Sequence, residues 1–250
     1  MTERKEMLRP RCLSATALKL IAMACMLLDH MWATVVDGNL WMSCVGRVAF
    51  PIFAFQVAEG YARTKNFKGY LLRMFLFALI SELPYNLMTG GWWFFPLRQN
   101  VMFTFCLALV LIRMIHRAGE RHWALGLAAA AVGSFVGYWV GMLTFVDYYG
   151  YGILMVLAFW LFRKMPFGWL ATLAAMVYIN FEMIGGLHLE LFLFGRSLMF
   201  PQQGFAVLAL IPIWLYNGER GPGGRAFQYA CYLFYPAHML ALVLVGTLIR

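Results

Sequence analysis

Nine apolar runs, each about as long as a membrane-spanning helix, follow one another along this chain. A span needs about 20 mostly apolar residues, and the runs that approach this length are 17–37, 43–62, 69–88, 100–116, 123–142, 147–163, 167–183, 199–217 and 227–248. Of the 250 residues, 63% are hydrophobic and only 12% are charged, which is too apolar for a water-soluble domain. The sequence therefore predicts an all-α transmembrane bundle of about nine spans. It forms a single integral-membrane domain over residues 1–250, with a short basic cytoplasmic N-terminus at 1–16.

The basic residues alternate along the chain as they do in multi-pass membrane proteins. If the N-terminus is cytoplasmic, 16 of the 20 Lys and Arg residues fall at the cytoplasmic side, so we expect the N-terminus inside and the C-terminus outside. These residues come in twos and threes between apolar runs, which argues against a nucleic-acid partner and indicates membrane lipids instead. The five cysteines lack metal-ligand spacing, and we predict no metal site. Gly137 and Gly141 have the small-xxx-small spacing of a close helix contact.

The first span carries two adjacent ionisable residues, Asp29 and His30. A charge at mid-membrane costs several kcal/mol on insertion scales, so such residues face the bundle interior and find partners there. Neighbours at i,i+1 do not face each other on a helix, so Asp29 cannot orient His30 within this span. We therefore expect separate partners for the two, and a cation is a candidate partner for Asp29. A histidine satisfied by a backbone carbonyl between packed helices is the structural alternative.

The second span contains Arg47 four residues before Pro51. Proline has no N–H, so the Arg47 carbonyl loses its helical partner and the helix is expected to kink there. The planar guanidinium suits carboxylates, phosphates and oxyanions. Nearer the cytoplasm, Glu59 and Arg63 are spaced i,i+4, which indicates an ion pair that anchors the helix end.

Two further spans add polar groups. Glu82, Tyr85 and Asn86 share one face of the third span near its outer end, and His238 follows Pro236 in the last span. Two histidines, an arginine and two carboxylates within one bundle are costly to keep for packing alone. These residues are therefore the candidate functional site.

Four blocks of the chain resemble the TraX family, named for a conjugative-plasmid protein that acetylates the N-terminus of pilin. They are LKLIAMACMLLDH (18–30), GRVAFPIFAFQVAEGYARTKN (46–66), YLLRMFLFALISELPYNLM (70–88) and YLFYPAHML (232–240). Weaker matches at 99–109 and 147–157 follow in the expected order. The resemblance covers nearly the whole chain, apart from about 117–146, which matches only in character.

The resemblance implies an integral-membrane acyltransferase of the bacterial cytoplasmic membrane, with cytoplasmic acetyl-CoA as acyl donor. In that reading His30 is the catalytic base, Arg47 contacts the donor or the developing oxyanion, and Asp29 and Glu82 are orienting or pairing carboxylates. Imidazole suits such proton transfer near neutral pH. Secondary roles fall to His238, Tyr85, Asn86 and Glu59. The acceptor, a pilin-like subunit or an envelope glycan, is left open.

Basic residues of one inner connection could hold the phosphates of coenzyme A: Arg63, Lys65, Lys68 and Arg73. The positive-inside rule explains these charges equally well. A proton-coupled small-molecule transporter is the main alternative function, because buried acids and histidines also build proton relays. A non-enzymatic membrane chaperone for secreted subunits is a third.

Overall fold

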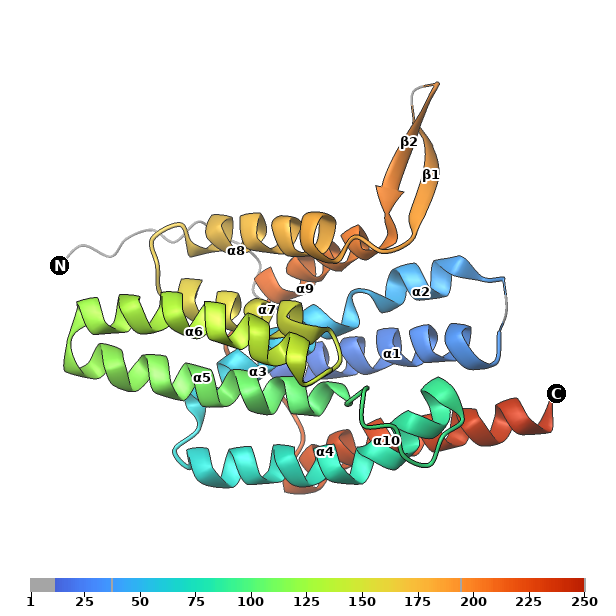
Figure 1. Cartoon of the computed structure of the whole chain (residues 1–250), viewed down its shortest axis with the longest axis horizontal. Helices are drawn as coiled ribbons and strands as arrows, with labels where there is room; N and C mark the ends of the chain where they lie inside the picture. The colour runs from blue at the N-terminus through green and yellow to red at the C-terminus, as the bar shows by residue number, and fades with distance from the viewer. Residues whose placement is uncertain (1–11, 37, 194, 250) are drawn as a thin grey trace.

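The computed structural model describes residues 12–36, 38–193 and 195–249, and most of the basic N-terminus predicted at 1–16 lies outside them. Within the described part, helices run side by side in one bundle (Figure 1). Six helical stretches are long and apolar enough to cross a membrane: α1 (Ala15–Thr34), α2 (Leu40–Gly46) with α3 (Ala49–Arg63), α4 (Phe67–Gly90), α5 (Val101–Arg121), α6 (Trp123–Leu143) and α10 (Arg225–Leu248).

Three shorter apolar stretches complete the bundle. They are α7 (Tyr149–Phe162), α8 (Gly168–Val177) with the π-helix η1 (Tyr178–Ile184), and the 3₁₀ helix η2 (Gln202–Ala209) with α9 (Leu210–Trp214). All nine predicted segments are thus helical over most of their length, and six of them reach membrane-spanning length. That the three short stretches also cross the membrane, which would give nine crossings, remains a prediction.

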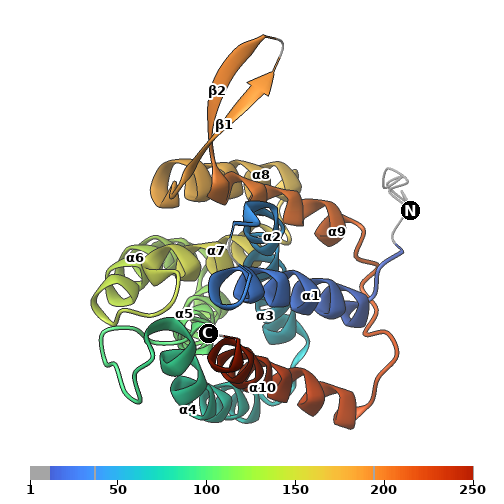
Figure 2. The same ribbon diagram turned by 90° about the vertical axis from the view of Figure 1, so that its right-hand side faces the viewer.

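A β-hairpin departs from the predicted all-helical pattern. Strands β1 (His188–Leu193) and β2 (Arg196–Pro201) pair antiparallel, with Leu189 opposite Phe200. The hairpin projects away from the bundle (Figures 1 and 2). The expected helix over 199–217 accordingly begins only at Gln202. Hydropathy averaged over a window cannot separate an apolar strand from the start of an apolar helix, which explains the difference.

The second span is interrupted where the sequence predicts a kink. α2 ends at Gly46, Arg47 and Val48 form a turn, and α3 begins at Ala49. Pro51 then stands at the third position of α3, where its missing N–H would have no partner within the helix anyway. The interruption leaves Arg47 at the junction of two helices, inside an apolar span.

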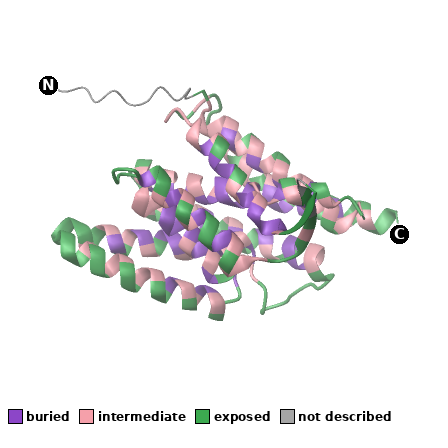
Figure 3. Cartoon of the chain, turned by 90° about the horizontal axis from the view of Figure 1, so that it is seen from above, coloured by how far each residue is buried: buried purple, intermediate pink, exposed green. Residues whose placement is uncertain are grey.

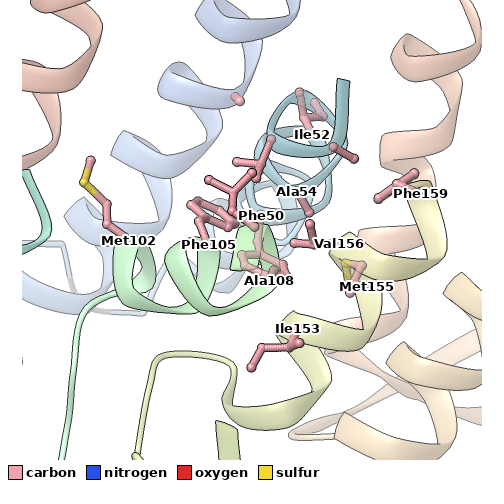
Figure 4. Close-up of a cluster of buried hydrophobic side chains, with 14 of the residues drawn as sticks. Phe50, Ile52, Ala54, Met102, Phe105, Ala108, Ile153, Met155, Val156 and Phe159 are labelled. Atoms are coloured by element: carbon pink, nitrogen blue, oxygen red, sulfur yellow. The ribbon is translucent and has the colours of Figure 1, made fainter. Parts of the chain in front are cut away.

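The core lies where α3, α5 and α7 meet. Phe50, Phe105 and Ile153 are among the buried side chains that these three helices contribute (Figure 4). Most residues between Gly150 and Phe159 of α7 are buried, which is typical of a helix that is apolar all round. Buried residues follow the middle of the bundle, while the hairpin is exposed (Figure 3).

Glycines allow α6 to approach α7 closely. A Cβ atom added to Gly141 would lie 2.6 Å from the backbone nitrogen of Gly150, and Gly137 is buried against Leu111 and Ile153. The predicted contact at Gly137 and Gly141 is therefore confirmed.

The two ends of the bundle differ in charge. At one end, the Leu13 N–H donates to the Leu215 carbonyl at 2.9 Å, which ties the start of α1 to the connection before α10. Lys19, Arg63 and Arg220 belong to this end, which we call the basic end. The connections at the opposite end are joined by the Gln99 N–H, which donates to the Phe145 carbonyl at 2.9 Å. A cytoplasmic location of the basic end remains a prediction.

Candidate functional site

Asp29 and Arg47 form an ion pair in the half of the bundle away from the basic end. Both carboxylate oxygens of Asp29 accept hydrogen bonds from Arg47 Nη2, and the Ser43 hydroxyl donates to Oδ1 at 2.8 Å. The two side chains are only 21% and 19% exposed. The predicted cation partner of Asp29 is thus Arg47, held in place by the interruption between α2 and α3.

Polar side chains from a distant part of the chain extend this pair. Arg47 Nε donates to the Ser43 carbonyl at 3.3 Å, and Nη1 lies 3.5 Å from Gln203 Oε1. Gln203 in turn donates to Asn180 Oδ1 at 3.0 Å. Nη2 is fully engaged, whereas Nη1 makes only this long contact, so the guanidinium keeps capacity for another acceptor.

His30 contacts His238 rather than Asp29. His30 Nδ1 lies 2.7 Å from His238 Nε2, and the two rings are nearly parallel, 7° apart. His238 Nδ1 lies 2.7 Å from the carbonyl oxygen of Phe234. Adjacent residues of α1 therefore have separate partners, as the helical geometry predicts. That the partner of His30 is His238, 208 residues away in sequence, could not be predicted.

A cavity of about 490 Å³ leads from the basic end toward this histidine pair. Four basic residues line it at the basic end, and we call them the basic rim: Lys19, Arg63, Arg73 and Arg220. Its lining also includes Met26 and Tyr235. His30 lies one helical turn beyond Met26, and His238 lies one turn beyond Tyr235, with the Tyr235 and His238 rings 5.9 Å apart. The histidines thus stand just past the deep end of the cavity.

Two helix stripes connect the basic rim to the histidines. On α1 the cavity is lined by Lys19, Met23 and Met26, and His30 continues the same i, i+4, i+7, i+11 series. On α10 the series is Gln228, Cys231, Tyr235 and then His238. This spacing is visible in the sequence, and it is the signal by which Lys19 and Tyr235 could have been added to the predicted site.

The four predicted phosphate-binding residues separate into two pairs. Arg63 and Arg73 line the cavity, whereas Lys65 and Lys68 are not among its lining residues. Lys68 borders a different, largely apolar groove between α4 and α5. Arg220, which lies 157 residues after Arg63, takes a place at the basic rim that sequence spacing does not reveal.

Glu82, Tyr85 and Asn86 lie together on α4, away from the ion pair. Glu82 Oε2 accepts from the Asn100 amide at 2.6 Å, and Asn86 is buried one turn further along. The Tyr85 ring lies 5.9 Å from the Arg98 guanidinium carbon. Among the described residues, no hydrogen bond joins Glu82 to His30 or Arg47.

Glu59 and Arg63 form the predicted i,i+4 ion pair. Arg63 is half-exposed at the basic end, and its guanidinium carbon also lies 5.9 Å from the centre of the Tyr216 ring. The pair anchors the end of α3 and places one member of the basic rim.

Asp147 adds a carboxyl group in the turn between α6 and α7, outside the six long helices. Burial raises its pKa to about 6, while the nearby guanidinium groups of Arg98 and Arg47 oppose this rise. Asp147 therefore stands on the same side of the bundle as the Asp29–Arg47 pair, close enough for their charges to interact.

These features define a multi-pass α-helical membrane protein with a polar site inside the bundle and a cavity that opens toward its basic end. The chain belongs to the TraX family, because the family model described as TraX protein matches residues 14–246. It is similar to the probable fimbrial assembly protein FimC, serogroup H1, of Dichelobacter nodosus, with 29% identity over an alignment of 245 residues that covers 92% of this chain and 94% of the relative. No solved structure matches the chain.

Proposed function

We propose that this protein is an acyltransferase that moves an acetyl group from acetyl-CoA, entering at the basic end, to an acceptor near the opposite side of the membrane. The observation that carries the proposal is a cavity with the basic rim at one end and the histidine pair just beyond the other. A transporter relay would use the buried acids and histidines, but it gives no reason for a cavity lined by four basic residues at one end.

The charge at the rim of the cavity and the length of α1 beside it support acetyl-CoA as the donor. Lys19, Arg63, Arg73 and Arg220 match the phosphates of coenzyme A, because Lys and Arg bind phosphate by charge-assisted hydrogen bonds. Between Lys19 and His30, α1 rises about 16 Å. An extended pantetheine arm is of comparable length and would run past Met23, Met26 and Tyr235. The thioester would then lie beside His30.

His30 would act as general base in the transfer. Its Nε2 removes a proton from the acceptor amine or hydroxyl as the acceptor attacks the thioester carbonyl carbon. The tetrahedral intermediate collapses with cleavage of the carbon–sulfur bond, and the proton passes from Nε2 to the coenzyme A thiolate. The products are the acetylated acceptor and free coenzyme A, so atoms and charge balance without a covalent enzyme intermediate.

Arg47 would stabilise the oxyanion of that intermediate. Its Nη1 donors are weakly engaged, its position is set by Asp29 and Ser43, and its charge lies close enough to interact with His30. A positioned donor of this kind typically contributes about 3–4 kcal/mol in a water-poor site.

The proposed acceptor class is drawn from the names of the family and of the relative. TraX is associated with acetylation of pilin, and the relative from Dichelobacter nodosus is named for fimbrial assembly. An amine at the N-terminus of a pilin-like subunit is therefore the acceptor that we propose, with an envelope glycan hydroxyl as the other outcome of the test below.

The test is acetyl transfer by the purified protein in lipid nanodiscs. Radiolabelled acetyl-CoA is supplied with a peptide that has a free N-terminal amine, and separately with a cell-envelope fraction. We expect label on the peptide with the wild type and a loss of at least about a hundredfold in kcat for His30→Gln. His116→Gln is the matched control, because His116 binds Tyr61 at the basic end and does not line the cavity.

The proposal fails if the wild-type protein neither binds acetyl-CoA nor transfers label to any fraction. Label in glycan alone would change the acceptor but keep the reaction. Solute uptake driven by a pH gradient and lost in Glu82→Gln would support the transporter instead.

A further inference from the structure

We propose that His238 is a positioning residue that holds His30 in the tautomer with hydrogen on Nδ1, which leaves Nε2 unprotonated to accept the acceptor's proton. The catalytic meaning of the free Nε2 rests on the proposed acyl transfer. The tautomer itself rests only on the hydrogen bonds around the two rings.

The direction of these hydrogen bonds follows from one atom that can only accept. The carbonyl oxygen of Phe234 has no hydrogen, so His238 Nδ1 must donate to it across 2.7 Å. A neutral imidazole carries one N–H, so His238 Nε2 then bears a lone pair. Its 2.7 Å contact with His30 Nδ1 requires His30 to be the donor. The remaining ring nitrogen of His30 is therefore Nε2 with a lone pair.

Packing prevents His238 from turning to another arrangement. The residue is only 6% exposed, and its ring stacks on Phe234 with centroids 4.8 Å apart and planes 10° apart. A half-turn of the ring would lose both hydrogen bonds at once. The orientation of His238 is thus determined by α10 itself, and His30 adapts to it.

Asp29 does not perform this task, although it is next to His30 in sequence. Its carboxylate is occupied by Arg47 and Ser43. An uncharged imidazole as orienting group adds no further ion to the apolar interior, where ions are costly. When Nε2 takes up a proton, the bond from His30 Nδ1 to His238 Nε2 becomes charge-assisted and therefore stronger. His238 thus serves as the carboxylate does in a serine-hydrolase triad.

The tautomer can be observed without any activity assay. Nitrogen-15 NMR of protein labelled at histidine, in nanodiscs, distinguishes protonated from unprotonated ring nitrogens, and His30→Gln identifies the His30 signals. We expect wild-type His30 to carry its hydrogen on Nδ1. In His238→Gln the new Oε1 replaces Nε2 as acceptor and should preserve this tautomer. In His238→Phe, and in His238→Asn, whose shorter side chain does not reach His30, the hydrogen should redistribute toward Nε2.

We expect kcat to rank the variants at residue 238 in the same order as the tautomer does. His238→Phe and His238→Asn should lower kcat by about a hundredfold or more while the KM for acetyl-CoA stays within about threefold, and His238→Gln should stay within about tenfold of the wild type. Only a role in proton transfer predicts rescue by glutamine but not by asparagine. Size-exclusion chromatography identifies any variant that fails to fold. Two variants that remove the acceptor, His238→Phe and His238→Asn, are used so that one can replace the other if it fails to fold.

Two results would overturn the inference. One is wild-type His30 with its hydrogen on Nε2, and the other is an unchanged His30 tautomer in both loss variants. If the tautomer follows residue 238 but no acetyl transfer occurs in any variant, the positioning by His238 stands and the proposed acyltransferase function fails.

Discussion

The contacts of individual side chains explain how ionisable residues are accommodated inside an apolar bundle. Asp29 and Arg47 neutralise each other, with Ser43 completing the carboxylate's hydrogen bonds. His30, which follows Asp29 on α1, contacts His238 of α10 instead. The identity of the ionisable residues was predictable from sequence, because each interrupts an apolar run. Their pairing was not, since the His30–His238 contact depends on how α1 and α10 pack.

Removal of one partner of the Asp29–Arg47 pair should destabilise the protein more than removal of Glu59 from its pair with the half-exposed Arg63. Asp29→Asn leaves the guanidinium without its counter-charge in a mostly buried position, and we expect a loss on the order of 1–3 kcal/mol. Glu59→Gln is the matched control, since Arg63 is half-exposed and such pairs contribute about 0.3–0.5 kcal/mol. Thermal unfolding in detergent measures both, and equal shifts in Tm would contradict the account.

Asp147 should make stability depend on pH. Its pKa is raised from 3.8 to about 6 in the folded protein, so its contribution to stability is fully present below pH 3.8 and is lost as pH rises through about 6. We expect the difference in Tm between wild type and Asp147→Asn to change in the variant's favour between pH 4 and pH 7. A difference that stays constant over this range would mean that Asp147 is not buried as described.

At the scale of helices, the sequence predicts where the elements lie better than what type they are. Nine apolar segments were expected and all are helical over most of their length, because apolar runs in lipid satisfy their backbone groups within a helix. The hairpin at 188–201 was missed, since most of it falls between the apolar runs 167–183 and 199–217, where hydropathy predicts only a connection. The kink at Arg47 was predicted, because Pro51 removes a specific hydrogen bond.

The α6–α7 crossing should be sensitive to one methyl group. Gly141→Ala would place a Cβ atom against the backbone of Gly150, so the helices must separate, and we expect a loss of about 1–3 kcal/mol. Gly133→Ala on the same helix meets only the flexible end of Ile115 and is the matched control. Unfolding in detergent compares the two variants, and a Gly141→Ala variant as stable as Gly133→Ala would refute the close crossing.

The four basic residues predicted to bind the phosphates should differ in their contribution to the binding of acetyl-CoA. Arg73→Glu reverses a charge that lines the cavity. Loss of a charged hydrogen bond typically costs about 1.5–3 kcal/mol, which corresponds to about a ten- to hundredfold rise in Kd. Lys65→Glu makes the same charge change outside the cavity lining and should leave Kd within about threefold. Equilibrium binding measures both, and equal weakening would indicate a general surface-charge effect rather than a site.

At the scale of the whole molecule, the fold brings distant segments to one cavity. The connection before α10 is tied to the start of α1, which places Arg220 beside residues of α1, α3 and α4. Charge alternation along the chain predicts that these basic residues share one end of the bundle. It does not predict which of them surround a cavity, because that depends on the angles at which the helices pack.

We propose that acetyl-CoA binds in the cavity between the basic rim and the histidine pair. Cryo-electron microscopy of the protein in nanodiscs with a non-transferable acetyl-CoA analogue tests it directly. We expect the phosphates of the analogue to lie at the basic rim, formed by Lys19, Arg63, Arg73 and Arg220. Its sulfur-bearing end should lie beside His30. An analogue bound elsewhere, for example in the groove between α4 and α5, or a cavity that stays filled by side chains, would contradict it.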